Sequence, residues 1–220
     1  MDLFTSLENL LPTYTTTLPF SKNEVLFTPF RVKDAKNISI ILQEDNKKLA
    51  LHAMIDLLKH NSKGINVMDL CLADAEFLFL QIRSKSVDEQ LNLIYNNEKV
   101  QIFIPDIQIK NNISNETFNI GNNISVILET PTLKDLVKLN SLDKQDFLKA
   151  CIKKVVVDKE IFYVNKFLPD EIHKLLENLP INVMPKFESF LSSQPELYVS
   201  FQQQNGTKEV SGILNFFISR

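Results

Sequence analysis

The sequence predicts an α+β protein in which two helical parts flank a small antiparallel β-sheet, followed by a C-terminal β-hairpin and a short terminal helix. Three observations lead to this prediction. Apolar residues of the segment 47–60 recur at helical spacing, whereas apolar and polar residues alternate with period two within residues 91–130. Between two later apolar segments, Asn205-Gly206 is a strong signal for a hairpin turn.

Three domains are expected: an N-terminal arm over 1–28, a helical domain with a small sheet over 29–140, and a mainly helical domain over 141–220. The arm combines a short amphipathic helix at its start with an extended part broken by Thr and Pro. Such an arm either packs on its own domain or reaches for a partner. The joint between the two larger domains is expected near Asn140–Ser141.

Three helices are expected before the sheet of the domain 29–140, and another is expected to start after Pro131. Helical spacing of apolar residues predicts helices over 34–43 and 47–60. A third helix should begin at a cap formed by Asp69 or Asp74 and run to Arg83. Apolar residues cover nearly its whole circumference, so we expect it to be buried on several sides.

One sheet is expected over about residues 91–130, with Pro105 at an edge or a bulge and Asn111–Asn115 as a mobile hairpin. After Pro131 the pattern returns to helices. One of them is expected to continue from Phe147 to near Lys159. Two shorter helices over 169–179 and 184–193 and a strand over 197–204 should follow. After the turn at Asn205-Gly206, the segment 210–220 (VSGILNFFISR) brings the chain to its end with the short terminal helix.

Composition limits the classes of function. The 220 residues, 44% hydrophobic and 23% charged, are ordinary for a folded domain with its own core. A formal net charge of −3 argues against a nucleic-acid coat, because binding through phosphates requires a basic field. The four glycines are too widely spaced to form a phosphate-binding loop, which excludes nucleotide binding of the P-loop or dinucleotide type.

No catalytic, cofactor or metal site is predicted. The three histidines lie in no metal-binding pattern, and Ser84 and Ser86 flank Lys85 at adjacent helical positions that face apart. Cys71 and Cys151 each have apolar neighbours and are expected to be buried, reduced thiols. The N-terminus shows no secretion signal and the chain shows no apolar segment of membrane-spanning length, so an intracellular protein is expected.

Basic and aromatic residues occur together in two blocks, 29–37 (PFRVKDAKN) and 74–89 (DAEFLFLQIRSKSVDE), and the chain ends with two adjacent phenylalanines. Arginine beside aromatic residues is typical of protein-docking surfaces, although a solvated basic face is the simpler interpretation. The terminal phenylalanines are either core residues or a plug for a partner. The sequence predicts eight partner-binding residues. Four supply the charged rim of the surface: Arg31, Lys33, Arg83 and Lys85. Four supply apolar anchors or the packing beneath them: Phe30, Phe79, Phe216 and Phe217.

The two blocks resemble a known family. PFRVKDAK matches the element P-F-x-V-K-(E/D)-x-K, and FLFLQIRSKSV matches the helix Y/F-L-F-L-x-(L/I)-R-x-K-S-V, of baseplate-hub assembly proteins from T-even-type contractile-tailed bacteriophages. GILNFF at 212–217 resembles the terminal G-(L/I)-x-x-F-F. The resemblance spans roughly residues 25–217. Several relatives carry Cys-x-x-Cys-Gly where this chain has QQQNG at 202–206, so the resemblance implies no metal role here.

The resemblance implies a late viral protein made in the cytoplasm of the infected bacterium. It would be a non-enzymatic hub subunit or hub-assembly chaperone that binds other baseplate hub proteins of the same phage and is a component of the virion tail if it is retained. It implies no cofactor, no small-molecule substrate and no membrane insertion. A second hypothesis is a small nucleic-acid-binding or host-directed regulator that uses the Arg83/Lys85 patch.

Overall fold

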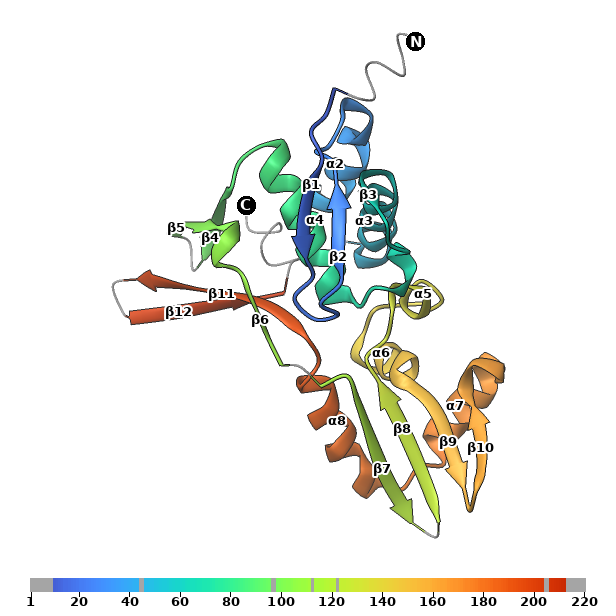
Figure 1. Cartoon of the computed structure of the whole chain (residues 1–220). Coiled ribbons are helices and arrows are strands. Elements are labelled where there is room, and N and C mark those ends of the chain that lie inside the picture. The colour runs from blue at the N-terminus through green and yellow to red at the C-terminus, as the bar shows by residue number, and fades with distance from the viewer. Residues whose placement is uncertain are drawn as a thin grey trace, which may run out of the picture. The chain divides into compact units, whose positions relative to one another are not determined.

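The computed structural model divides the chain into two compact units. The first unit comprises Met1–Lys110 with Glu196–Arg220, and the second comprises Asn111–Pro195. Figure 1 shows the helices and strands of the two units. The strands form several small antiparallel sheets, and the combination of helices with such sheets confirms the α+β class. This division differs from the domain boundaries expected at 28/29 and 140/141. The structure describes residues 10–43, 46–95, 98–111, 113–121, 123–203 and 206–212.

Three helices form the centre of the first unit: α2 (Ala35–Gln43), α3 (Lys47–Asn61) and α4 (Leu72–Ser86). The predicted helices 34–43 and 47–60 are thus confirmed. The Asn46 side chain caps α3 because its oxygen accepts the N–H groups of the first helical turn.

Helix α4 is buried on several sides, as the sequence predicts. Its buried residues lie all round the helix and are Ala73, Asp74, Ala75, Glu76, Leu78, Phe79, Leu80 and Ile82. The predicted cap is wrong, since α4 begins after Cys71 and Asp74 lies within its first turn. Asp69 instead ends a separate 3₁₀ turn, Val67–Asp69.

Asp74 fastens the N-terminal strands to this helix. Its carboxylate is fully buried and accepts the N–H groups of Phe20 (2.8 Å) and Ser21 (2.9 Å). These two residues lie in the turn between β1 (Tyr14–Thr17) and β2 (Glu24–Phe27), which pair antiparallel. The described part of the expected arm therefore packs on its own unit, while the helix expected at its start falls largely outside the described residues.

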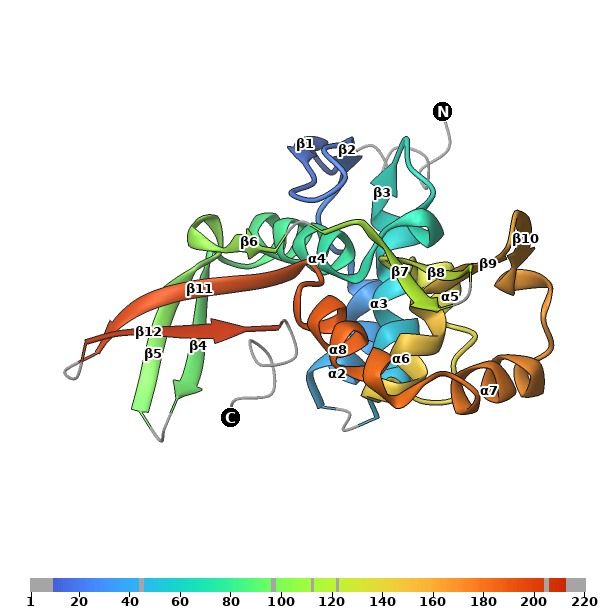
Figure 2. The same ribbon diagram turned by 90° about the horizontal axis from the view of Figure 1, so that it is seen from below.

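Two hairpins project together from the first unit. Figures 1 and 2 show β4–β5 and β11–β12 side by side, extending away from α4. Tyr95 and Phe201 contact edge to face with 5.4 Å between ring centroids, and Gln203 Nε2 donates to Glu98 Oε2 at 3.0 Å. The strands involved are β4 (Gln90–Tyr95), β5 (Glu98–Phe103), β6 (Gln108–Lys110), β11 (Glu196–Gln203) and β12 (Gly206–Ser211).

The predicted C-terminal hairpin is confirmed by β11 and β12, whereas the terminal helix predicted after it lies outside the described residues. The single sheet predicted over 91–130 is wrong, because its strands belong to three sheets. The 3₁₀ turn Ile104–Asp106, which contains Pro105, separates β5 from β6. The described residues of 111–115 form no hairpin and instead connect β6 to β7 of the second unit.

The second unit is a four-stranded antiparallel sheet with helices on one face. Its strands have the order β10-β9-β8-β7, and Figure 2 shows α6, α7 and α8 on the same side of them. Phe118, Phe187 and Phe190 lie at the centre of its core. The elements are β7 (Asn115–Gly121), β8 (Ile124–Glu129), α5 (Leu133–Leu136), α6 (Lys144–Cys151), β9 (Ile152–Val157), β10 (Glu160–Tyr163), α7 (Pro169–Glu177) and α8 (Met184–Ser192).

The helix predicted from Phe147 to Lys159 is only half present. Helix α6 ends at Cys151, and Ile152–Val157 form β9, which pairs with both β8 and β10. The reason is the β-branched segment at its end, since valine and isoleucine lose side-chain freedom in a helix and pack well on a sheet. The helices predicted over 169–179 and 184–193 are confirmed as α7 and α8.

Both cysteines are buried free thiols, as predicted. Burial raises the pKa of Cys71 to about 12, with a further contribution from the nearby Asp74 charge, and burial likewise raises the pKa of Cys151 to about 12. In the described part of the chain, every helix is too short or too polar to span a lipid bilayer.

The raised thiol pKa values give a pH-dependent prediction. Unfolded thiols ionise near pH 9 and folded ones only near pH 12, so their contribution to stability is complete below pH 9 and is lost between these values. We expect iodoacetamide to leave both cysteines unmodified in native protein at pH 9 and to alkylate them rapidly in urea. Mass spectrometry of alkylated peptides measures this; rapid labelling of either native thiol would contradict the burial.

Replacement of the buried Asp74 carboxylate tests the attachment of the N-terminal strands. Asp74→Asn puts an amide N–H₂ against one backbone N–H, and we expect the free energy of unfolding to fall by about 1–3 kcal/mol. Urea denaturation measures the loss. Asp69→Asn is the matched control, because Asp69 is exposed and its carboxylate, among the described residues, accepts a single local hydrogen bond from Asn66. Equal stability of the two variants would contradict the role of Asp74.

Candidate interaction surface

The chain between β2 and α2 forms a tight turn held from inside the protein. Arg31 has an extended backbone, and Val32–Asp34 then form one turn of 3₁₀ helix. Oδ2 of the buried Asp34 carboxylate accepts the Arg31 N–H at 2.8 Å and the Asn61 amide at 3.2 Å. The Asn61 carbonyl also accepts the Thr28 N–H at 2.9 Å. Helix α3, which carries Asn61, therefore fixes both sides of the turn.

The same turn places Val32 outward. Val32 is 94% exposed, Lys33 beside it is exposed, and Arg31 is half-buried. An exposed valine gains no burial energy in this unit. The sequence interpretation missed Val32 and named only the cations beside it. The available signal was the position of Val32 between those two cations.

Phe30 joins the turn to the end of α4. Its N–H donates to Ser86 Oγ at 2.7 Å, and the Ser86 hydroxyl donates to the Ile82 carbonyl at 2.6 Å. The rings of Phe30 and Phe79 lie 5.5 Å apart between centroids. Since Phe79 is 1% exposed and Phe30 is half-buried, Phe79 is a core residue beneath the surface and Phe30 is the accessible aromatic.

Arg83 has a structural role at the end of α4. Its Nη1 donates to the carbonyls of Asp88 (3.0 Å) and Gln90 (3.3 Å), so the guanidinium holds the connection between α4 and β4. Burial lowers the pKa of Arg83, with a smaller opposing effect from the Asp88 charge. The side chain remains a cation, but its donors face this connection.

Lys85 lies closer to solvent than Arg83. Its Nζ pairs with Glu89 Oε1 at 2.6 Å and lies 5.9 Å from the centroid of the Tyr14 ring. Val87, which follows the helix, is 75% exposed. Because Ser86 binds the Phe30 backbone, this helix end and the turn form one surface. We call it the turn surface and define it as Phe30, Arg31, Val32, Lys33, Lys85 and Val87.

The structure thus brings six of the eight predicted residues into one region: Phe30, Arg31, Lys33, Phe79, Arg83 and Lys85. Phe79 and Arg83 lie beneath or beside the turn surface rather than on it. Phe216 and Phe217 fall outside the described residues, so the interpretation of these two as anchors stays a prediction.

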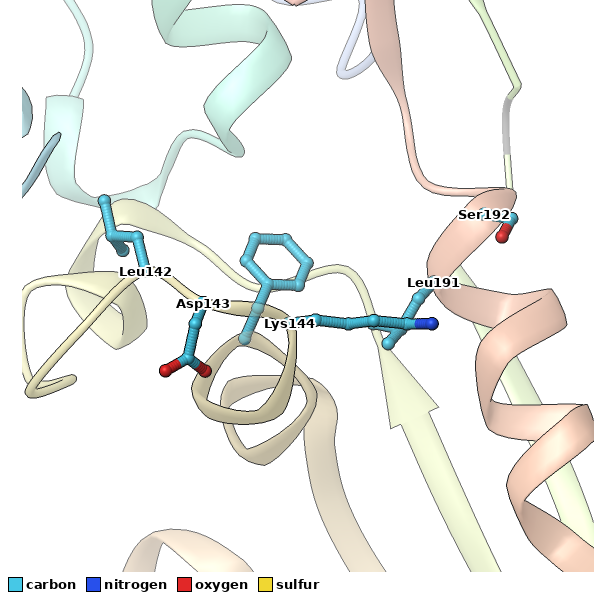
Figure 3. Close-up of a pocket in the computed structure, with 6 residues that line it drawn as sticks. Leu142, Asp143, Lys144, Leu191 and Ser192 are labelled. Carbon is cyan, nitrogen blue, oxygen red and sulfur yellow. The ribbon is translucent and has the colours of Figure 1, made fainter.

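Two cavities lie among the described residues of the second unit. Figure 3 shows the smaller one, about 310 Å³, between α6 and α8, where Lys144 extends from α6 toward Leu191. Lys144 Nζ pairs with Glu188 Oε1 of α8 at 3.0 Å. The residues that line this cavity are Leu142, Asp143, Lys144, Phe147, Leu191 and Ser192.

The larger cavity, about 470 Å³, contains lysines that are paired with carboxylates. Lys153 lies 2.6 Å from Asp135, and Lys149 lies 2.7 Å from Asp146. Burial opposes ionisation of Asp135, but its hydrogen bond and charge interaction with Lys153 outweigh this and lower the pKa of Asp135. The Lys153–Asp135 pair joins β9 to α5, whereas the Lys149–Asp146 pair lies within α6. Within the described ranges, no cluster of three or more His, Cys, Asp or Glu side chains could hold a metal ion.

The comparisons with known proteins identify a family. A search of curated proteins found no match, and a search of solved structures found no match. A family profile described as T4 bacteriophage base plate protein matches residues 11–218, which is nearly the whole chain and includes every residue of the turn surface. The chain therefore belongs to the T4-type baseplate protein family.

Proposed function

We propose that this baseplate protein acts by docking and not by catalysis, in assembly of the central hub of the phage tail baseplate. It would be either a hub subunit or an assembly chaperone that binds other hub proteins in the host cytoplasm. The observation that supports this proposal best is the rigid turn that exposes Val32 beside Lys33.

The turn surface has the composition and the rigidity that docking requires. Val32 and Val87 supply exposed apolar area, and the cations Arg31 and Lys33 flank Val32, as in interfaces with an apolar centre and a polar rim. The buried Asp34 carboxylate fixes the turn before any partner arrives. A surface that is ordered in advance loses little conformational entropy on binding.

The nucleic-acid hypothesis has less support from the geometry. It depends on Arg83 and Lys85, yet Arg83 donates to two backbone carbonyls and Lys85 pairs with Glu89. A DNA-binding assay over a series of salt concentrations separates the two hypotheses, since affinity that depends on phosphates falls steeply as salt rises.

Val32→Asp tests the docking proposal. We expect it to weaken binding to purified hub proteins of the same phage by about tenfold or more, because a charge replaces an apolar contact at the centre of the interface. Surface plasmon resonance measures the affinity. Ile181→Asp is the matched control, since Ile181 also begins a 3₁₀ turn and is 85% exposed, but in the second unit.

A second control separates folding from docking. Arg83→Met removes the hydrogen bonds to Asp88 and Gln90 and should lower stability by about 1–2 kcal/mol in urea denaturation. Lys33→Glu should leave stability unchanged and weaken binding. Unaltered affinity in both Val32→Asp and Lys33→Glu would remove the turn surface from the proposal.

Mass spectrometry of purified phage particles and of infected-cell lysate distinguishes the two forms of the proposal. A hub subunit should be detected in both samples, at a constant ratio to other baseplate proteins in the particles. An assembly chaperone should be detected in the lysate alone. Absence of the chain from all baseplate intermediates isolated from that lysate would contradict both forms.

A further inference from the structure

The larger cavity of the second unit lies at one end of its sheet. The cavity wall includes Glu129 at the end of β8, Ile152 at the start of β9 and Tyr163 at the end of β10. Neighbouring strands of this sheet run antiparallel, so these three positions lie at the same end. The volume of about 470 Å³ falls within the range of ligand-binding pockets.

Apolar side chains form part of the wall and continue outside the cavity. Ile152 and Val164 are buried, and Phe167 is half-buried. Tyr163 is 44% exposed, and Ile161, two positions earlier on the same face of β10, is 51% exposed. Exposed apolar area of this kind becomes stabilising only when a partner covers it. Because this area extends beyond the cavity, it fits a segment of polypeptide better than a small molecule enclosed in the cavity.

Two ion pairs of the wall use their charges internally. Asp135 accepts hydrogen bonds from Lys153 Nζ at 2.6 Å and from the N–H and hydroxyl of Thr132 at 3.1 and 3.0 Å. Asp146 accepts a hydrogen bond from Lys149 Nζ at 2.7 Å. Lys149 and Lys153 are therefore already paired with carboxylates of their own unit.

The other two lysines of the wall have unused donors. Lys154 Nζ lies 3.8 Å from Glu129 Oε1 and 5.8 Å from the centroid of the Tyr163 ring, and it donates no hydrogen bond to any described residue. Lys138 is exposed, and none of the carboxylates in the described ranges pairs with it. With four lysines and three carboxylates, the wall has a net charge of +1, whereas the whole chain has −3. One negative charge on a ligand would balance this wall.

We propose that the cavity binds an acidic residue of another protein, on a segment in which a large apolar residue adjoins it. The carboxylate pairs with Lys138 and Lys154, and the apolar side chain packs against Phe167 and Tyr163. Charge-assisted hydrogen bonds from the two ammonium groups select a carboxylate over an uncharged amide. The site consists of residues of the second unit alone and shares none with the turn surface, so it goes beyond the proposed function.

Fluorescence anisotropy with the full chain tests this proposal. The probe is a labelled octapeptide of glycine and serine that contains one phenylalanine followed by one glutamate; the matched probe has glutamine in place of the glutamate. We expect the glutamate peptide to bind about tenfold more tightly. Lys138→Gln and Lys154→Gln should each reduce this preference to about threefold or less. Both variants should fold normally, because one lysine is exposed and the other makes only a long ion pair near the surface.

Lys134→Gln is the matched control, since Lys134 is an exposed lysine of α5 that lies outside the cavity wall. It should keep the full preference for glutamate. Val32→Asp should not alter peptide binding, so failure of this proposal and failure of the docking proposal give different results. No binding of either peptide, equal affinity for the two peptides, an equal loss in Lys134→Gln, or displacement of the bound peptide by an equimolar amount of free phenylpropionate would each overturn the proposal.

Discussion

The first unit depends on one helix that is buried on nearly its whole circumference. Polar side chains of a buried helix need hydrogen-bond partners inside the protein, and three of those on α4 each fasten a different segment. Asp74 holds the turn between β1 and β2, Ser86 holds the Phe30 backbone, and Arg83 holds the connection to β4. The arrangement of this unit follows from that requirement.

Elements with a local signal could be predicted from the sequence, and strand partners could not. The apolar stripe of 47–60 and the Asn205-Gly206 turn indicate α3 and the β11–β12 hairpin without reference to any other segment. Apolar and polar residues alternate within 91–130, and this pattern correctly indicates strands. It does not indicate which sheet each strand joins, because a partner strand can lie far along the chain, as when β6 pairs with β11, which begins at Glu196. The apolar spacing that begins at Phe147 indicates a helix through residues 152–157, but the β-branched side chains of this segment favour the strand that it forms.

The sequence indicates which residues lie together around the turn surface, but not which of them are exposed. Basic and aromatic composition indicates the region, since both sequence blocks meet where Ser86 binds Phe30. Composition does not show whether a side chain points outward. Phe79 lies in the core and Arg83 turns toward backbone carbonyls, whereas Val32 is nearly fully exposed. Exposure is decided by how Asp34 and Asn61 orient the turn, which requires two segments that are distant in sequence.

The second unit is an insertion within a strand pair of the first, because Lys110 and Glu196 are opposite partners in β6 and β11. This has a consequence for the order of events on the ribosome. All residues of the second unit emerge before β11 exists, so that unit can fold while the first is still incomplete. The pair of hairpins β4–β5 and β11–β12 is then the last part of the described structure to be completed.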